Sequence, residues 1–193
     1  DRAIKTNQND HQEHIEAAYS LQERGLFKWS EREYRHVMKL APPGSLHELR
    51  SRFLLSEMLH DLERELPAAQ ILQAVVDNME KDKNVVHTAA RMRRNRGSVG
   101  SRMHYFYSER YRSQGNLKKQ REHLQKAVES DPTDADVLIA MYRFDDADKQ
   151  WEDITRRHIK EAVQGFRDQM RECEQEVASA PSEELRAFYR REL

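Results

Sequence analysis

Nine histidines and many carboxylates give this sequence several pairs of side chains whose types suit chemistry. His11 and His14 lie three residues apart on a predicted helix, a spacing at which two imidazoles can share a metal ion. A protein metal site needs three or four ligands, so this pair alone favours a solvated helix face. Cys173 and His158 lie roughly 22 Å apart along a straight helix, too far for a nucleophile and its base. We therefore predict no catalytic residue, no metal site and no cofactor.

Sequence motifs for phosphate binding and hydrolysis are also missing. The segment from Arg96 to Ser101 reads RGSVGS, but it follows no predicted strand and lacks the Lys and Ser or Thr of a phosphate-binding loop. Neither a G-x-S-x-G turn nor an H-E-x-x-H helix is present. We expect the Gly-Ser segment to be an ordinary loop and the chain not to be an enzyme.

A basic run is the one local signal for nucleic acid. It comprises Arg91, Arg93, Arg94, Arg96 and Arg102, and the aromatic residues Tyr105, Phe106 and Tyr107 follow. Arginines interleaved with aromatic rings can neutralise phosphates and stack on bases. The same rings also suit helix packing, and the same arginines suit an acidic protein surface. Nucleic-acid binding through Arg91–Arg102 is therefore kept as an alternative to protein binding.

The composition indicates the elements that must position these residues. Hydrophobic residues make up 37% of the 193 residues and charged residues 35%, a balance that suits an elongated helical array better than a compact globule. Strong helix formers are abundant, whereas Gly and Pro are few. The 33 basic and 34 acidic residues nearly cancel, and no long apolar run exists, so we expect no membrane span.

An internal repeat appears when the chain is shifted by 90 residues against itself. The aligned pairs are Leu21 with Tyr111, Gly25 with Gly115, Tyr34 with Leu124, Val37 with Ala127, and Pro42 with Pro132. This order places apolar residues on a first helix, Gly in a turn, a second apolar stripe, and Pro where the second helix must stop. The pattern predicts repeated helix pairs.

The stretch from Ser101 to Asp134 reads SRMHYFYSERYRSQGNLKKQREHLQKAVESDPTD. It resembles the 34-residue tetratricopeptide repeat in its mid-helix Tyr, its QGN turn, its KA pair and its closing DP. The stretch from His11 to Pro42 is similar, with Ala18 as the small residue between helices. A weaker copy follows 38 residues after the first, without the turn Gly or the closing Pro. The resemblance implies an all-α fold, a right-handed superhelix of helix pairs.

The pattern departs from this family in two long segments. Helical spacing continues past the weak copy, which predicts one extended helix over 67–96. A second long helix is predicted over 148–180, with Asp148 as its N-cap and a stripe containing Trp151, His158, Phe166 and Cys173.

These elements give a predicted domain organisation. Residues 1–10 form a polar extension, and 11–193 form one repeat domain with repeats at about 11–44, 46–80 and 101–134, a divergent repeat over 135–180, and a truncated helix over 181–193. The missing initial Met and the truncated helix lead us to expect a fragment. The compartment is left open, with the cytoplasm favoured.

The resemblance also implies where a partner binds, because this family binds along the concave face lined by the first helix of each pair. The matching positions are Gln12, Ile15, Tyr19, Gln22, Arg50, Phe53, Glu57, His60, Arg102, Tyr105, Glu109 and Arg112. Ile15 and Tyr19 stand where some members carry the Lys and Asn of a carboxylate clamp, so a chaperone tail is a poor candidate ligand.

The sequence therefore predicts a non-catalytic protein-interaction scaffold whose partner, a protein or peptide, is unidentified. Self-association through Leu185, Phe188 and Tyr189 is a further possibility. An accessory helical domain of a larger enzyme is the remaining alternative.

Overall fold

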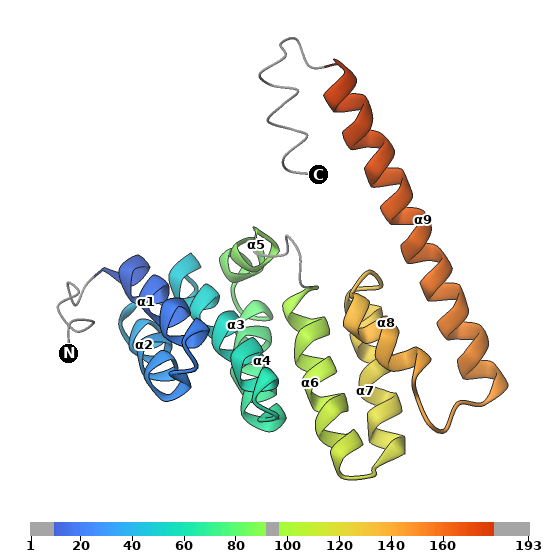
Figure 1. Ribbon diagram of the computed structural model, residues 1–193, viewed down its shortest axis with the longest axis horizontal. Helices are drawn as coiled ribbons and strands as arrows, with labels where there is room; N and C mark the ends of the chain where they lie inside the picture. Colours follow the sequence, from blue (N-terminus) through green and yellow to red (C-terminus); the bar gives the residue numbers. More distant parts are fainter. Residues whose placement is uncertain (1–9, 92–96, 180–193) are drawn as a thin grey trace. The chain divides into compact units, whose positions relative to one another are not determined.

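A computed structural model describes residues 10–91 and 97–179 of the chain. These residues are all-helical and include no strand. Their helices are α1 His11–Glu23, α2 Phe27–Leu40, α3 Leu46–Asp61, α4 Glu65–Met79, α5 Lys83–Arg91, α6 Val99–Ser113, α7 Leu117–Ser130, α8 Ala135–Tyr142 and α9 Lys149–Ser179 (Figure 1). The chain divides into two compact units, 1–146 and 147–193, and the boundary falls inside the predicted divergent repeat.

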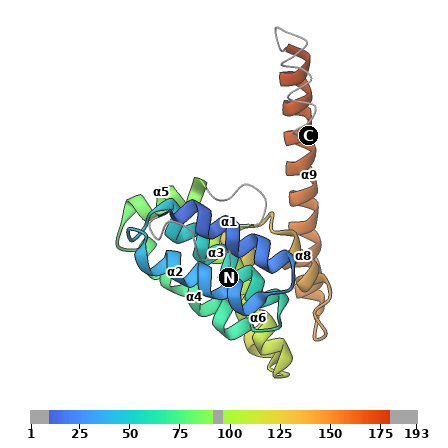
Figure 2. The same cartoon turned by 60° about the vertical axis from the view of Figure 1, so that its left-hand side comes forward.

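In the first unit, helices that follow one another in the chain also pack together. The packed pairs are α1 with α2, α2 with α3, α3 with α4, α6 with α7, and α7 with α8 (Figures 1 and 2). Helix α4 packs directly on α6, while α5 packs on α3 and α4. Helix α5 is thus an insertion in the chain between two helix pairs that pack directly on each other.

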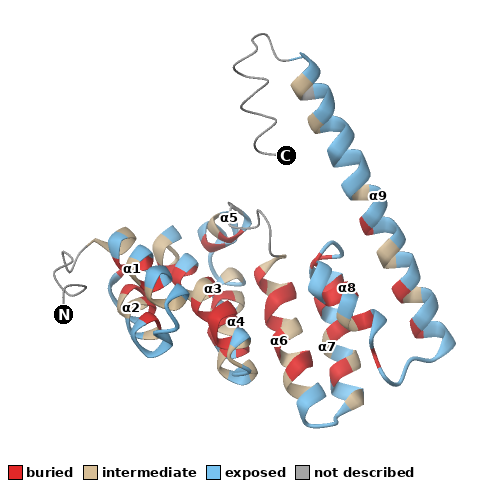
Figure 3. Ribbon diagram, in the orientation of Figure 1, coloured by how far each residue is buried: buried red, intermediate tan, exposed pale blue. Residues whose placement is uncertain are grey.

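The buried residues form one continuous apolar cluster from Ile15 in α1 to Phe106 in α6, and Figure 3 shows buried positions on α3, α4 and α6. Positions related by the offsets of 38 and 90 residues are buried in all three helix pairs. They are Ala18, Ser56 and Ser108; Ser30, Ala68 and Gln120; Tyr34, Leu72 and Leu124; and Val37, Val75 and Ala127. Positions that the sequence repeat aligns are therefore also buried at equivalent places in the three helix pairs.

The turns inside the three pairs share one hydrogen-bond pattern. In each, a residue with positive φ donates its N–H to the carbonyl three residues back, and the next N–H reaches the carbonyl five residues back. The positive-φ residues are Gly25, Glu63 and Gly115, at 74°, 57° and 67°. Glu63 takes the place of the glycine missing from the weak copy.

The helix predicted over 67–96 is wrong, because the structure has two helices, α4 and α5, in its described part. The N–H groups of Lys81 and Asp82 both donate to the carbonyl of Asn78, which ends α4. The Asp82 carboxylate then accepts from the N–H of Asn84 at 2.8 Å and begins α5. No Gly or Pro marks this turn in the sequence.

The long helix predicted over 148–180 is confirmed as α9, Lys149–Ser179. The N–H of Trp151 donates to the Asp148 carboxylate at 2.7 Å, so the predicted cap is also confirmed. On the predicted stripe Trp151 is buried, His158 and Cys173 are half-buried, and Phe166 is exposed. Residues 1–9 of the predicted extension over 1–10, and the predicted helix over 181–193, lie outside the described residues, while Asp10 is the N-cap of α1.

Candidate functional site

The twelve residues that the sequence assigned to partner binding lie on α1, α3 and α6, and we call them the first-helix face. They differ in exposure. The buried members are Ile15, Phe53, Glu57, Arg102 and Glu109; the half-buried members are Gln12, Gln22, His60 and Tyr105; the exposed members are Tyr19, Arg50 and Arg112. The exposed and half-buried residues are therefore the ones that can meet a partner.

Arg102 is the most connected member of this face. Its guanidinium donates to both carboxylate oxygens of Glu57 on α3, at 2.9 and 2.8 Å, and to Asp136 on α8 at 2.7 Å. Asp134, the N-cap of α8, lies 3.5 Å away and also accepts from Ser101 at 2.9 Å. Burial alone would lower the pKa of Arg102, but these carboxylates raise it. Arg102 therefore fixes α3, α6 and α8 to one another.

Aromatic rings surround this guanidinium. It lies 4.9 Å from the centroid of Tyr105 and 5.0 Å from that of Phe106. The His60 ring stacks on Phe106 at 4.8 Å and meets Tyr105 edge-on at 5.3 Å. The imidazole of His60 is 2.8 Å from Glu65. Burial would lower the pKa of His60, but the bond to Glu65 raises it overall.

Burial disfavours the charged form of two carboxylates in this region, those of Glu109 and Asp134. Burial raises the pKa of Glu109, and nearby Glu65 adds to the shift, although Arg112 opposes it at 2.5 Å. Burial also raises the pKa of Asp134 despite Arg102. Burial, Glu109 and Asp136 raise the pKa of Tyr105, so its hydroxyl stays protonated at neutral pH. The carboxylates of Glu57 and Asp136 accept hydrogen bonds from the Arg102 guanidinium and hold it in a fixed position.

The α1 part of the first-helix face is more open. Tyr19 is 51% exposed. Gln12 donates to Glu16 at 2.7 Å and accepts from Arg50 of α3 at 3.5 Å, which links α1 and α3 by a weak bridge. Exposed Tyr and Arg side chains are the types that most often dominate protein interfaces.

The basic run is only partly described. Arg102 is 3% exposed and is surrounded by carboxylates, so its guanidinium is not offered to a phosphate. Arg93, Arg94 and Arg96 lie outside the described residues, and the side chain of Arg91 is likewise not described.

The histidines of α1 contact other helices. His14 lies 2.6 Å from Glu33 and its ring centroid is 4.5 Å from that of His36, while His11 faces His47 at 5.9 Å. Within 10–91 and 97–179, no three His, Cys, Asp or Glu side chains are grouped closely enough to hold a metal ion. Cys173 is a half-buried free thiol on α9, and the imidazole of His158 lies 3.8 Å from the carboxylate of Glu161.

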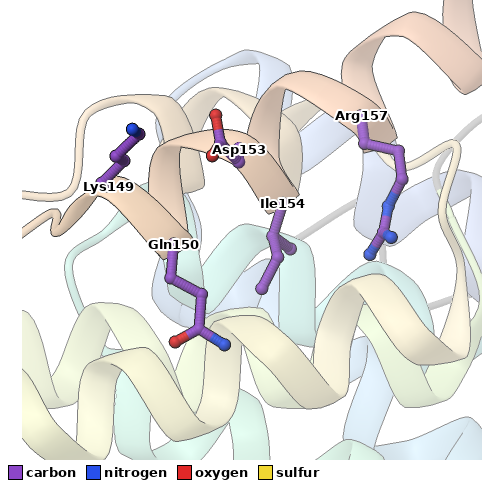
Figure 4. A pocket seen from close by; sticks show the side chains of 5 residues that line it. All are labelled: Lys149, Gln150, Asp153, Ile154 and Arg157. Atoms are coloured by element: carbon purple, nitrogen blue, oxygen red, sulfur yellow. The ribbon is translucent and has the colours of Figure 1, made fainter.

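The first turns of α9 line a hollow of about 740 Å³, shown in Figure 4. Its lining residues are Lys149, Gln150, Asp153, Ile154 and Arg157. Four of these five side chains are polar, with both charge signs, and none is a nucleophile beside a base.

Sequence reasoning missed Asp134 and Asp136, which hold Arg102 from α8. Their only sequence signal is the capping pattern at the start of α8, where Asp134 accepts from the N–H groups of Asp136 and Val137. A partnership between residues 34 positions apart leaves no trace in a single sequence.

Comparison of the chain with family models, with curated protein sequences and with solved structures finds no match in any of the three. The tetratricopeptide assignment therefore stays a prediction. Across the part of the chain that the structure describes, no helix combines the length and apolar character needed to cross a membrane.

Proposed function

We propose that this chain is a tetratricopeptide-like, right-handed superhelix of helix pairs that acts as a non-catalytic scaffold. In this proposal a protein or peptide partner binds the concave side, formed by α1, α3 and α6. The supporting observation is that three helix pairs share one register of buried positions and one turn geometry. Stacked units that repeat in this way bury a continuous core and leave one set of helices free for binding.

The rigidity of the first-helix face also supports the proposal. Arg102 and its carboxylates lock α3, α6 and α8 together, so the exposed residues around them are held on a rigid support. A surface that is ordered before binding loses less conformational entropy when a partner arrives. Tyr19, Arg50 and Arg112 are the exposed residues expected to contribute most of the affinity.

The test is affinity capture from the native source with the whole chain and two triple variants as bait. The first variant carries Tyr19→Ala, Arg50→Ala and Arg112→Ala. The matched control carries Phe166→Ala, Arg167→Ala and Arg171→Ala, which removes one exposed aromatic and two exposed arginines from α9. We expect one protein to be retained by the intact chain and the control, and lost by the first variant at unchanged helicity.

Two results would contradict the proposal. Equal recovery of that protein by all three baits would show that the first-helix face is not the site. Loss with the α9 control alone would move the binding surface to the second unit.

A further inference from the structure

A second candidate surface lies at the turn ends of the first two helix pairs. A hollow of about 560 Å³ opens there. Its apolar lining comes from the α1–α2 turn, the start of α2 and the end of α3, and comprises Leu26, Phe27, Trp29 and Leu62. Trp29 is 49% exposed, Leu26 44% and Phe27 36%. Three large apolar side chains exposed side by side are unusual on a monomer surface and mark interaction sites.

The turn geometry explains why these side chains face outward. Gly25 takes a positive φ of 74°, and the next N–H, that of Leu26, donates to the carbonyl of Leu21 at 2.9 Å. This motif ends α1 and starts α2 within a few residues, so Leu26 and Phe27 sit at the tip of the pair. Trp29 follows in the first turn of α2. The backbone that carries these side chains is thus held in place by the hydrogen bonds of the turn.

Some charged groups around the hollow form ion pairs with one another, and others do not. The carboxylate of Glu31 accepts from Arg35 at 2.9 and 2.8 Å and from Arg64 of the next turn at 2.8 Å. Burial would raise the pKa of Glu31, but Arg64 and Arg35 lower it, so it stays ionised and engaged. Two guanidinium groups therefore share one carboxylate.

The remaining cations at the rim have no carboxylate of their own. Lys28 lines the hollow without an ion-pair partner among residues 10–91 and 97–179. Arg32 lies over the Trp29 ring, 5.8 Å from its centroid. The rim therefore presents excess positive charge around an apolar floor.

We propose that this hollow is a docking site for an acidic protein segment that carries an apolar anchor residue. The anchor enters against Leu26, Trp29 and Leu62, and flanking Asp or Glu side chains pair with Lys28 and Arg32. Opposite charge at the rim of an apolar pocket gives orientation and a faster encounter, while the buried anchor gives affinity.

A protein segment fits this site better than a nucleic acid. Leu26, Phe27 and Leu62 offer apolar surface that no base or ribose requires. Arg64 is already held by Glu31, which leaves Lys28 as the one lining cation not shared with a carboxylate. A nucleic-acid site needs several free cations along a backbone track.

The test is selection of a random peptide library displayed on phage against the full chain, followed by fluorescence anisotropy of the selected peptides. We expect enrichment of sequences with an aromatic or aliphatic residue flanked by Asp and Glu. Their affinity should fall about tenfold or more with Trp29→Ala, as for an interface anchor, and fall similarly with Lys28→Glu. It should also weaken as salt is raised.

The matched controls are Lys118→Glu, at the equivalent exposed position of the third helix pair, and Tyr19→Ala on the first-helix face. Both should leave the affinity unchanged. Selected peptides that are basic, or that bind Trp29→Ala as well as the intact chain, would overturn the proposal, as would the absence of enrichment. Displacement of the peptides by a single-stranded oligothymidine that binds more tightly would assign the hollow to nucleic acid instead.

Discussion

Glu63 occupies a left-handed backbone position, with a φ of 57°, that glycine fills in the two matching turns. A side chain with a Cβ atom is strained there by about 1 kcal/mol or more. We predict that Glu63→Gly raises the free energy of unfolding by about 0.5–1 kcal/mol, because the relief of strain exceeds the added entropy of the unfolded chain. Urea denaturation measures this change.

Glu63→Ala is the control, since it removes the same charge but keeps a Cβ atom. It should give no comparable gain. Equal stabilisation by both variants would show that the charge of Glu63, and not its backbone conformation, carries the cost.

Arg102 is the residue whose loss should cost most. Arg102→Met would leave Glu57 and Asp134 buried without their cation, and breaking a buried pair in this way costs about 3 kcal/mol or more. Thermal or urea unfolding of the whole chain would measure it. Arg156→Ala removes an exposed arginine 3.3 Å from Asp153 and should change stability by less than about 0.5 kcal/mol. Similar small effects for both variants would contradict the role of Arg102 in fixing α3, α6 and α8 to one another.

His104 should make stability depend on pH. Burial, aided by His123 at 3.2 Å and by Lys126, lowers the pKa of His104 to about 4 from its ordinary 6.5. The unfolded chain therefore binds the proton first as pH falls. The stabilising contribution of neutral His104 is complete above pH 6.5 and is lost between pH 6.5 and about 4.

We predict that, between pH 7 and pH 4.5, the free energy of unfolding falls by about 1 kcal/mol less for His104→Gln than for the natural chain. The difference is only of this size because water still reaches part of the ring and weakens the effect of burial. His87→Gln, at an exposed position of α5, is the control and should leave the pH dependence unchanged. Parallel pH profiles for the natural chain and His104→Gln would rule out this role.

At the scale of elements, Gly97 shows how the start of α6 meets the start of α8. A Cβ atom at Gly97 would lie 2.3 Å from the carboxylate of Asp134, and the φ of 77° also disfavours any other residue. We predict that Gly97→Ala lowers the free energy of unfolding by about 2 kcal/mol, through backbone strain and displacement of the α8 cap. Denaturation midpoints would measure it.

Gly165→Ala is the matched substitution, in α9, where an added Cβ would meet no described atom within 4 Å beyond the neighbouring backbone of its own helix. It should stabilise α9 by up to about 1 kcal/mol, because Ala is the better helix former. A neutral effect of Gly97→Ala would show that this joint is loose.

Element prediction worked where the sequence itself carries the stop signal. Gly25, Gly115, Pro42 and Pro132 end helices near the expected places because each acts through its own backbone. The break between α4 and α5 was not predictable, because it is made by Asn78 and Asp82 through hydrogen bonds and not by a helix-breaking residue.

At the scale of the whole molecule, the sequence predicted which positions face the core but not how the candidate face is occupied. Burial of Tyr34, Leu72 and Leu124 follows from periodicity, since each helix must bury its apolar stripe. The burial of Arg102 beneath carboxylates of α3 and α8 depends on which helices become neighbours. Of the twelve residues predicted to form the binding face, five are buried and seven are half-buried or exposed.

The central claim is that α1, α3 and α6 hold a protein partner. Hydrogen–deuterium exchange of the whole chain, alone and with the protein recovered by capture, tests it most directly because amide protection reports local ordering by helix. We predict slower exchange in α1, α3 and α6 on binding, with α2, α4 and α7 unchanged. Protection confined to α2, α4 and α7, or to α9, would contradict it.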